Sequence, residues 1–178
     1  MSRLITIKDK QFKPYISQQK IEEAVKSVAL RMNEELKNEL PVFLVVLNGA
    51  FMFAADLLKE ISIPCEISFI KVASYLGTNS SGNVTELIGL SEDLGQRTVV
   101  IVEDIVDTGL TVERLTELLK RKNVKQVKVA TAFMKPDCYK KDCVIDYVGL
   151  AIADEFVVGY GLDYEGHGRN LKEIYILA

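Results

Sequence analysis

Histidine and cysteine, the side chains behind most zinc sites and many covalent mechanisms, are scarce in this chain of 178 residues. His167 is the only histidine, which leaves little room for a histidine-rich metal centre or a Ser-His-Asp triad. The three cysteines, Cys65, Cys138 and Cys143, are odd in number and contain no Cys-x-x-Cys pair, so they do not predict a disulfide framework. We expect free thiols, as in a reducing compartment.

The chain also lacks a long apolar run and an excess of positive charge. No stretch approaches the ~18–20 apolar residues of a membrane-spanning helix. The formal net charge of −3 gives no basic footprint for nucleic acid or an anionic membrane. Asp9 falls where a secretory signal peptide would need its apolar core. We therefore expect a cytoplasmic protein that binds neither nucleic acid nor membrane.

What the chain does have is a high apolar content and alternating helical and strand patterns. Hydrophobic residues make up 48%, and no linker or repeat divides the sequence, so we expect residues 1–178 to form a single domain. Apolar positions at three- and four-residue spacing predict a helix over 17–40, with Ser17 as its cap and Pro41 as its stop. Further helices are expected at 50–60 and 110–122, and strands at 42–47, 64–72, 98–102, 127–133 and 147–151. This order predicts an α/β fold with a mostly parallel sheet flanked by helices, whose ligands bind at the carboxyl ends of the strands.

One segment, residues 99–111, carries the most chemical information. Four β-branched apolar residues predict a buried strand, and the acidic pair Glu103 and Asp104 follows where that strand is expected to end. An Asp-Thr-Gly-x-Thr turn then leads into a helical pattern. Backbone amides at a helix N-terminus attract an anion, whereas two carboxylates beside them repel one. A ligand with both a phosphate and diol hydroxyls, together with a divalent metal, resolves this conflict, and a phosphorylated ribose fits that description.

The same segment resembles the phosphoribosyl-pyrophosphate (PRPP) signature of the type I phosphoribosyltransferases. The resemblance implies a small hood at about residues 154–178 and a flexible lid loop at about 74–86. It assigns the ribose hydroxyls and a Mg²⁺ ion to Glu103 and Asp104, and it makes Asp107 the general acid/base for the purine proton. The loop that it implies for the PRPP phosphate and ribose comprises Asp107, Thr108, Gly109, Leu110 and Thr111.

Later segments resemble the hypoxanthine-guanine phosphoribosyltransferases of the bacterial type. Lys135 follows an apolar strand pattern, at the place of the lysine that donates to the purine 6-oxo group in that branch. In the run Asp-Glu-Phe-Val-Val-Gly-Tyr-Gly-Leu-Asp-Tyr, Phe156 would stack on the purine and the Val157 backbone would bond its edge. The resemblance assigns Asp163 to the magnesium ion.

The remaining matching segments concern pyrophosphate and the lid. Arg169 matches a pyrophosphate-binding arginine, whose planar fork suits phosphate oxygens. Asn48 and Gly49 stand where the family has its pyrophosphate loop, and many members carry a lysine or arginine at the place of Asn48. Ser74 and Tyr75 match a pair on the mobile lid, whose closure would exclude water.

The implied reaction is transfer of the 5-phosphoribosyl group from PRPP to N9 of hypoxanthine, and of guanine, with release of pyrophosphate. Mg²⁺ is the implied cofactor, PRPP and a 6-oxopurine are the implied ligands, and a homodimer or homotetramer is the implied assembly. Within the enzyme class, a preference for xanthine or a pyrimidine is the alternative. Lys135 with Phe156 and Val157 disfavours a pyrimidine.

Other interpretations of the signature segment belong to different classes of protein. In a purely structural strand–turn–helix corner, Asp107 would only cap the helix. A regulator that binds PRPP or nucleotides as a signal, with RNA as a partner, would show a basic face and a degraded catalytic set. A receiver-like signalling domain would use Glu103 and Asp104 as an acidic pocket. It would also need a phosphoacceptor aspartate after another central strand, where Asn48 stands.

Overall fold

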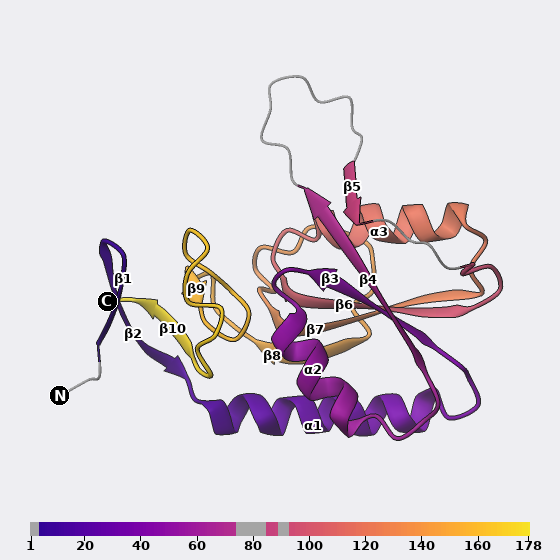
Figure 1. The fold of residues 1–178 in the computed structure, drawn as a ribbon, viewed down its shortest axis with the longest axis horizontal. Helices are drawn as coiled ribbons and strands as arrows, with labels where there is room; N and C mark the ends of the chain where they lie inside the picture. Colours follow the sequence, from indigo (N-terminus) through magenta and orange to yellow (C-terminus); the bar gives the residue numbers. More distant parts are fainter. Residues whose placement is uncertain (1–3, 74–84, 89–92) are drawn as a thin grey trace.

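The structure is a computed structural model that describes residues 4–73, 85–88 and 93–178 (Figure 1). Two β-sheets and the helices around them account for the regular structure in these ranges. Ser74 and Tyr75, with most of the expected lid, lie outside the described residues. Thr85 and Glu86, which the sequence analysis assigns to the end of that loop, instead begin a short strand.

The larger sheet has six strands in the order β5-β4-β3-β6-β7-β8. The strands are β3 (Val42–Leu47), β4 (Glu66–Ala73), β5 (Thr85–Ile88), β6 (Thr98–Val106), β7 (Gln126–Met134) and β8 (Tyr147–Ala151). All neighbours pair in parallel except β5, which runs antiparallel to β4. The central strands are continuous apolar runs because both of their faces are covered, as is typical of a parallel sheet.

Helices cover both faces of this sheet. α1 (Gln18–Glu35) and α2 (Phe51–Glu60) pack on one face, and α3 (Leu110–Arg121) packs on the other (Figure 1). The Ser17 hydroxyl caps α1 by accepting from the Lys20 backbone N–H at 3.4 Å, as expected. Among the described residues, no helix is long and apolar enough to cross a membrane.

The smaller sheet joins the two ends of the chain, which the sequence analysis did not foresee. Its strands are β1 (Ile5–Ile7), β2 (Lys10–Ile16), β9 (Val157–Val158) and β10 (Ile174–Leu177), in the antiparallel order β1-β2-β10-β9. The expected hood at 154–178 therefore needs the N-terminal hairpin to complete it. Ile16, Val157 and Ile174 belong to the same buried cluster as the central sheet, so the two sheets share a core.

The expected elements of the central sheet and its helices are confirmed, with corrections at their ends. The helix expected over 17–40 ends at Glu35, because the backbone of Leu36, with φ −105° and ψ 9°, leaves the helical conformation and the chain then turns toward β3. The strand expected over 98–102 continues to Val106, since β7 pairs with it along its length. The acidic pair therefore lies inside a strand and not after it. The other bounds shift by at most two residues.

Candidate active site

Predicted site residues follow three neighbouring parallel strands at one edge of the sheet, and a further site residue follows the fourth. Asn48 and Gly49 come after β3, the loop 107–111 after β6, Lys135 after β7, and Asp154 a few residues after β8. The carboxyl ends of parallel strands meet at the same edge, which is where α/β proteins bind their ligands. The fold thus brings together residues that are more than a hundred positions apart in the sequence.

The loop 107–111 connects β6 to the N-terminus of α3. Gly109 stands immediately before the helix with a φ of 83°, a left-handed conformation that strongly favours glycine. In the part of the chain that the structure describes, no side chain caps this helix. Its first N–H groups and the positive end of its dipole therefore face the loop, an arrangement that suits a phosphate. Thr108 is exposed and Thr111 half-buried, so both hydroxyls lie near the surface of the loop.

Glu103 and Asp104 form a pair of carboxyl groups on β6, of which Glu103 is buried and Asp104 half-buried. Glu103 is only 5% exposed, and burial followed by the neighbouring Asp104 charge raises its pKa well above the usual value. Burial also raises the pKa of Asp104, although the Ile105 backbone N–H, at 2.8 Å from Oδ1, and the Arg169 guanidinium offset part of that effect. The pair therefore holds a proton to higher pH than two separate carboxyl groups would.

Gly49 lies directly against this acidic pair. A Cβ atom on Gly49 would stand 1.5 Å from Oδ2 of Asp104, so only glycine allows the loop after β3 to approach β6 this closely. The peptide bond between Leu47 and Asn48 is cis, and the Asn48 side chain is exposed. The carbonyl oxygen of Gly49 in turn lies against Gly161, which connects this loop to the C-terminal segment.

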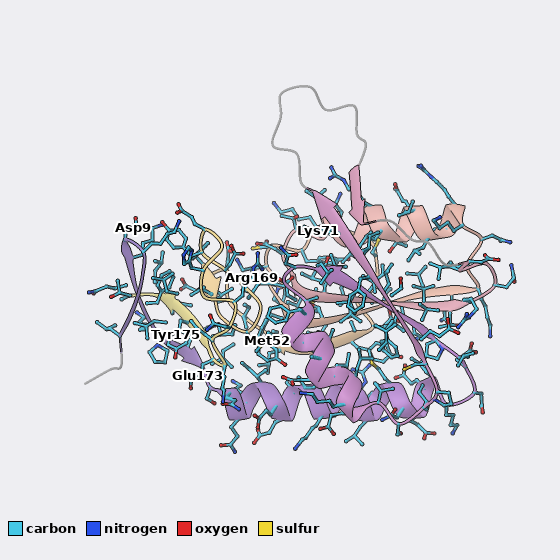
Figure 2. All side chains as sticks on the ribbon, viewed as in Figure 1. Asp9, Met52, Lys71, Arg169, Glu173 and Tyr175 are labelled. Carbon is cyan, nitrogen blue, oxygen red and sulfur yellow. The ribbon has the colours of Figure 1, made fainter. Side chains whose placement is uncertain are left out.

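Arg169 is held beside the same loop by the C-terminal segment. Its guanidinium bonds Oδ1 of Asp163 at 2.6 Å and donates to the Gly161 carbonyl at 2.7 Å. The other Asp163 oxygen accepts from the Gly166 N–H at 2.6 Å. Figure 2 shows Arg169 between the smaller sheet and the central sheet. Among the described residues, no group of three or more His, Cys, Asp or Glu side chains lies close enough to hold a metal ion. The structure thus does not bring Asp163 into one cluster with Glu103 and Asp104.

Lys135 lies between the phosphate loop (residues 107–111) and the segment that follows β8, and it contacts a carboxylate from each. Its ammonium lies 3.3 Å from Oδ2 of Asp107 and 3.1 Å from Oδ1 of Asp154. Burial by itself lowers the pKa of Lys135, but the hydrogen bonds and charges of these two carboxylates outweigh it and the pKa is raised. The lysine is therefore a charged donor, although it is only 8% exposed.

Phe156 and Val157, which are predicted to contact the base together with Lys135, lie on the side of the smaller sheet. Val157 is buried in β9, whereas Phe156 is 46% exposed and so has ring surface free for a ligand. The centroid of the Phe156 ring lies 6.4 Å from that of Phe12 in β2 and 6.0 Å from that of Tyr164. The N-terminal hairpin thus supports the residue expected to stack on the base.

Asp154 and Cys138 are site residues to which the sequence analysis gave no role. Asp154 pairs with Lys135, and the Cys138 thiol reaches the same two carboxylates, Asp154 and Asp107. Partial burial and these neighbouring charges raise the pKa of Cys138, which keeps the thiol protonated. The sequence does carry a signal for Asp154. It follows the expected strand 147–151, as Lys135 follows the expected strand 127–133, so both were candidates for the same edge of the sheet.

Comparison with known proteins agrees with this geometry. Residues 14–165 match the phosphoribosyl transferase domain family. The hypoxanthine-guanine phosphoribosyltransferase of Bacillus subtilis is 40% identical over 93% of this chain and 92% of its own length. That of Staphylococcus epidermidis is 41% identical, over 89% of each chain.

Solved structures give the same result. A hypoxanthine phosphoribosyltransferase from Staphylococcus aureus superimposes with a TM-score of 0.88 at 36% identity, over 93% of this chain and 91% of that one. A hypoxanthine-guanine phosphoribosyltransferase from Bacillus anthracis gives 0.86, also at 36% identity, over 93% and 96%. These relatives cover nearly the whole chain, and the signature loop occupies the expected edge of the sheet. The chain belongs to the phosphoribosyltransferase family, within its hypoxanthine-guanine branch.

Proposed function

We propose that this protein is a purine salvage enzyme that transfers the 5-phosphoribosyl group of PRPP to N9 of hypoxanthine and guanine, giving IMP or GMP and pyrophosphate. The relatives that carry this activity in their names are similar along nearly the full chain. One observation carries the proposal: Lys135 is hydrogen-bonded to Asp107, the first residue of the phosphate loop. A donor suited to a 6-oxo group thus stands next to a site suited to phosphoribose.

The reaction breaks the bond between the anomeric carbon and pyrophosphate, so positive charge develops on the ribose in the transition state. Glu103 and Asp104 would bind the 2′ and 3′ hydroxyls and favour that charge. Arg169 and the backbone amides of Asn48 and Gly49 would bind the departing pyrophosphate, with the guanidinium fork matching two of its oxygens. Thr108, Gly109, Leu110 and Thr111, with the backbone of Asp107, would hold the 5′-phosphate.

The purine would be recognised from two sides. Lys135 donates to the 6-oxo group, which gains electron density as N9 bonds to the sugar, and Asp107 takes the proton that leaves N7. Phe156 stacks on the ring, and the Val157 backbone bonds its edge. Ser74 and Tyr75 belong to a lid that excludes water from the activated sugar.

Magnesium fits the donor set at the acidic pair. Glu103 and Asp104 place carboxyl oxygens, which Mg²⁺ prefers as ligands, side by side, and the Asp104 charge disfavours ionisation of the buried Glu103. These two residues would hold the ion with oxygens of PRPP, and Asp163 would reach it directly or through water. When bound, the ion neutralises charge that builds up on the leaving pyrophosphate.

We further propose that residues 1–178 act as one catalytic domain, that the enzyme forms a homodimer or homotetramer, and that it works in the cytoplasm. The shared core of the two sheets supports the single domain. The formal net charge of −3 gives no reason to expect a nucleic-acid partner.

The test is an assay of PRPP-dependent nucleotide formation with hypoxanthine, guanine, xanthine, adenine and uracil, with and without Mg²⁺. We expect IMP and GMP to form only with Mg²⁺, and adenine and uracil to be inactive. Adenine presents an amino donor to the Lys135 donor, so its exclusion follows from the proposed contact. Binding of PRPP without transfer to any base would support the regulatory alternative and contradict the proposal.

A further inference from the structure

The Lys135 ammonium has three N–H donors and two carboxylate acceptors. The acceptors are Asp107 Oδ2 at 3.3 Å and Asp154 Oδ1 at 3.1 Å. In the described ranges of the chain, these are the only ion pairs that the lysine makes. One donor is therefore left for a ligand, and the two carboxylates determine where it points.

The two acceptors come from strands on opposite sides of the lysine. Lys135 follows β7, Asp107 follows β6 and Asp154 follows β8, and β7 lies between the other two in the sheet. Backbone bonds fix these segments without help from the Asp154 side chain. The Lys135 N–H donates to the Val106 carbonyl at 2.9 Å, and the Ile152 N–H donates to the Met134 carbonyl at 2.8 Å. The Asp154 carboxylate thus acts on the end of the lysine side chain and not on its backbone.

We infer that Asp154 is a positioning residue for base recognition, which with Asp107 directs the third N–H of Lys135 at the 6-oxo group of the purine. The inference rests on the proposed role of Lys135. A lysine held by one carboxylate could rotate about that bond, whereas two acceptors from opposite sides leave one direction for the free donor. Asp154 does not touch the base or the sugar in this scheme.

The electrostatics of the trio agree with such a role. The Lys135 side chain is 10% exposed, while that of Asp154 is 65% exposed. The hydrogen bond from Lys135 lowers the pKa of Asp154, so the carboxylate is charged at every pH at which the enzyme would be assayed. Exposure makes this ion pair a weak contributor to folding, so removing it should change substrate recognition more than stability.

The experiment compares Asp154→Asn and Asp154→Ala with Glu155→Gln, which removes the neighbouring exposed carboxylate. Steady-state kinetics give kcat and KM for hypoxanthine and for PRPP, and thermal melts check folding. We expect Asp154→Ala to raise the KM for hypoxanthine about threefold to tenfold, between the effects of an exposed ion pair and a charge-assisted hydrogen bond. The KM for PRPP should stay unchanged, Asp154→Asn should lose less because its amide oxygen still accepts, and Glu155→Gln should match the parent.

A double-mutant cycle with Lys135→Met separates positioning from a general structural effect. If Asp154 acts through the lysine, adding Asp154→Ala to Lys135→Met should change the KM for hypoxanthine no further. Additive losses, or an Asp154→Ala variant that matches Glu155→Gln, would overturn the inference. If Lys135→Met itself leaves the hypoxanthine KM unchanged, the proposed role of Lys135 fails instead, and the two failures are distinguishable.

Discussion

At the scale of one residue, burial of Glu103 lowers the stability of the unliganded protein, while its carboxylate is proposed to bind the ribose hydroxyls and Mg²⁺. A carboxyl group with a raised pKa keeps its proton in the folded chain at a pH where the unfolded chain has lost it. The unfolded state then binds fewer protons, so stability falls as pH rises from about the ordinary value of 4.5 through the raised value. Below pH 4.5, Glu103 is protonated in both the folded and the unfolded state, so its ionisation does not lower the stability.

We therefore expect Glu103→Gln to stabilise the unliganded protein at pH 8 and to have little effect at pH 4. Replacing a buried ionisable group of this kind is worth about 1–2 kcal/mol, within the range seen when buried ionic groups are replaced by neutral ones. For a chain of this size that corresponds to roughly 2–8 °C in Tm. Melting curves at both pH values, with the exposed Glu117→Gln as control, measure the difference. The same variant should bind PRPP with Mg²⁺ more weakly, and an equal Tm change at both pH values would contradict the account.

At the scale of elements, the central sheet was predictable because its strands are continuous apolar runs. The expected strands at 42–47 and 147–151 have the observed bounds. The small sheet was missed because its strands are short, one contains Pro14, and they pair across almost the whole chain. For the site, the signature loop could be recognised in the sequence. The contact of Gly49 with Asp104 could not, since it depends on how two loops pack.

Gly49→Ala tests that loop contact. The added methyl would stand 1.5 Å from Oδ2 and 2.4 Å from Cγ of the half-buried Asp104, so either that side chain or the loop after β3 must shift. Overpacking of this kind costs about 1–3 kcal/mol of stability. We expect the KM for PRPP to rise by about tenfold or more, because displacing a substrate-binding group by about an ångström can reduce activity by that factor or more. In Gly95→Ala the nearest atom would be the exposed Asp93 carboxylate at 3.1 Å, so this control should match the parent. A parental KM for PRPP in Gly49→Ala would exclude the loop from pyrophosphate binding.

At the scale of the whole molecule, the two ends of the chain build one support for the base. β2 from the N-terminal hairpin pairs with the C-terminal β10, and Phe12 in β2 is fully buried beneath Phe156 and Tyr164. The base side of the site therefore depends on residues about 140 positions away in sequence, as the separation of Phe12 and Phe156 shows. This dependence could not be seen in either segment alone.

Phe12→Ala should weaken this support. Truncating a buried phenylalanine destabilises a protein by about 3–5 kcal/mol, and we expect a loss in that range from urea unfolding. In the fraction that remains folded, the KM for hypoxanthine should rise more than the KM for PRPP. The reason is that the phosphate loop follows β6 of the larger sheet and not a strand of the smaller one. Leu30→Ala, at a position on α1 that is 70% exposed, is the control. Equal changes in both KM values would indicate that the small sheet does not act on the base.

The most direct test concerns the transfer of the purine N7 proton to Asp107, the residue of the phosphate loop that contacts Lys135. Asp107→Asn keeps the size of the side chain but removes the base, and no helix cap is lost because no described side chain caps α3. We predict a fall in kcat of about 10²–10⁴-fold for hypoxanthine, the usual contribution of general acid–base catalysis, with PRPP affinity nearly unchanged. Single-turnover rates and a separate PRPP binding measurement on the same preparation give both values. A variant that folds, binds PRPP and converts hypoxanthine at the parental rate would contradict the account.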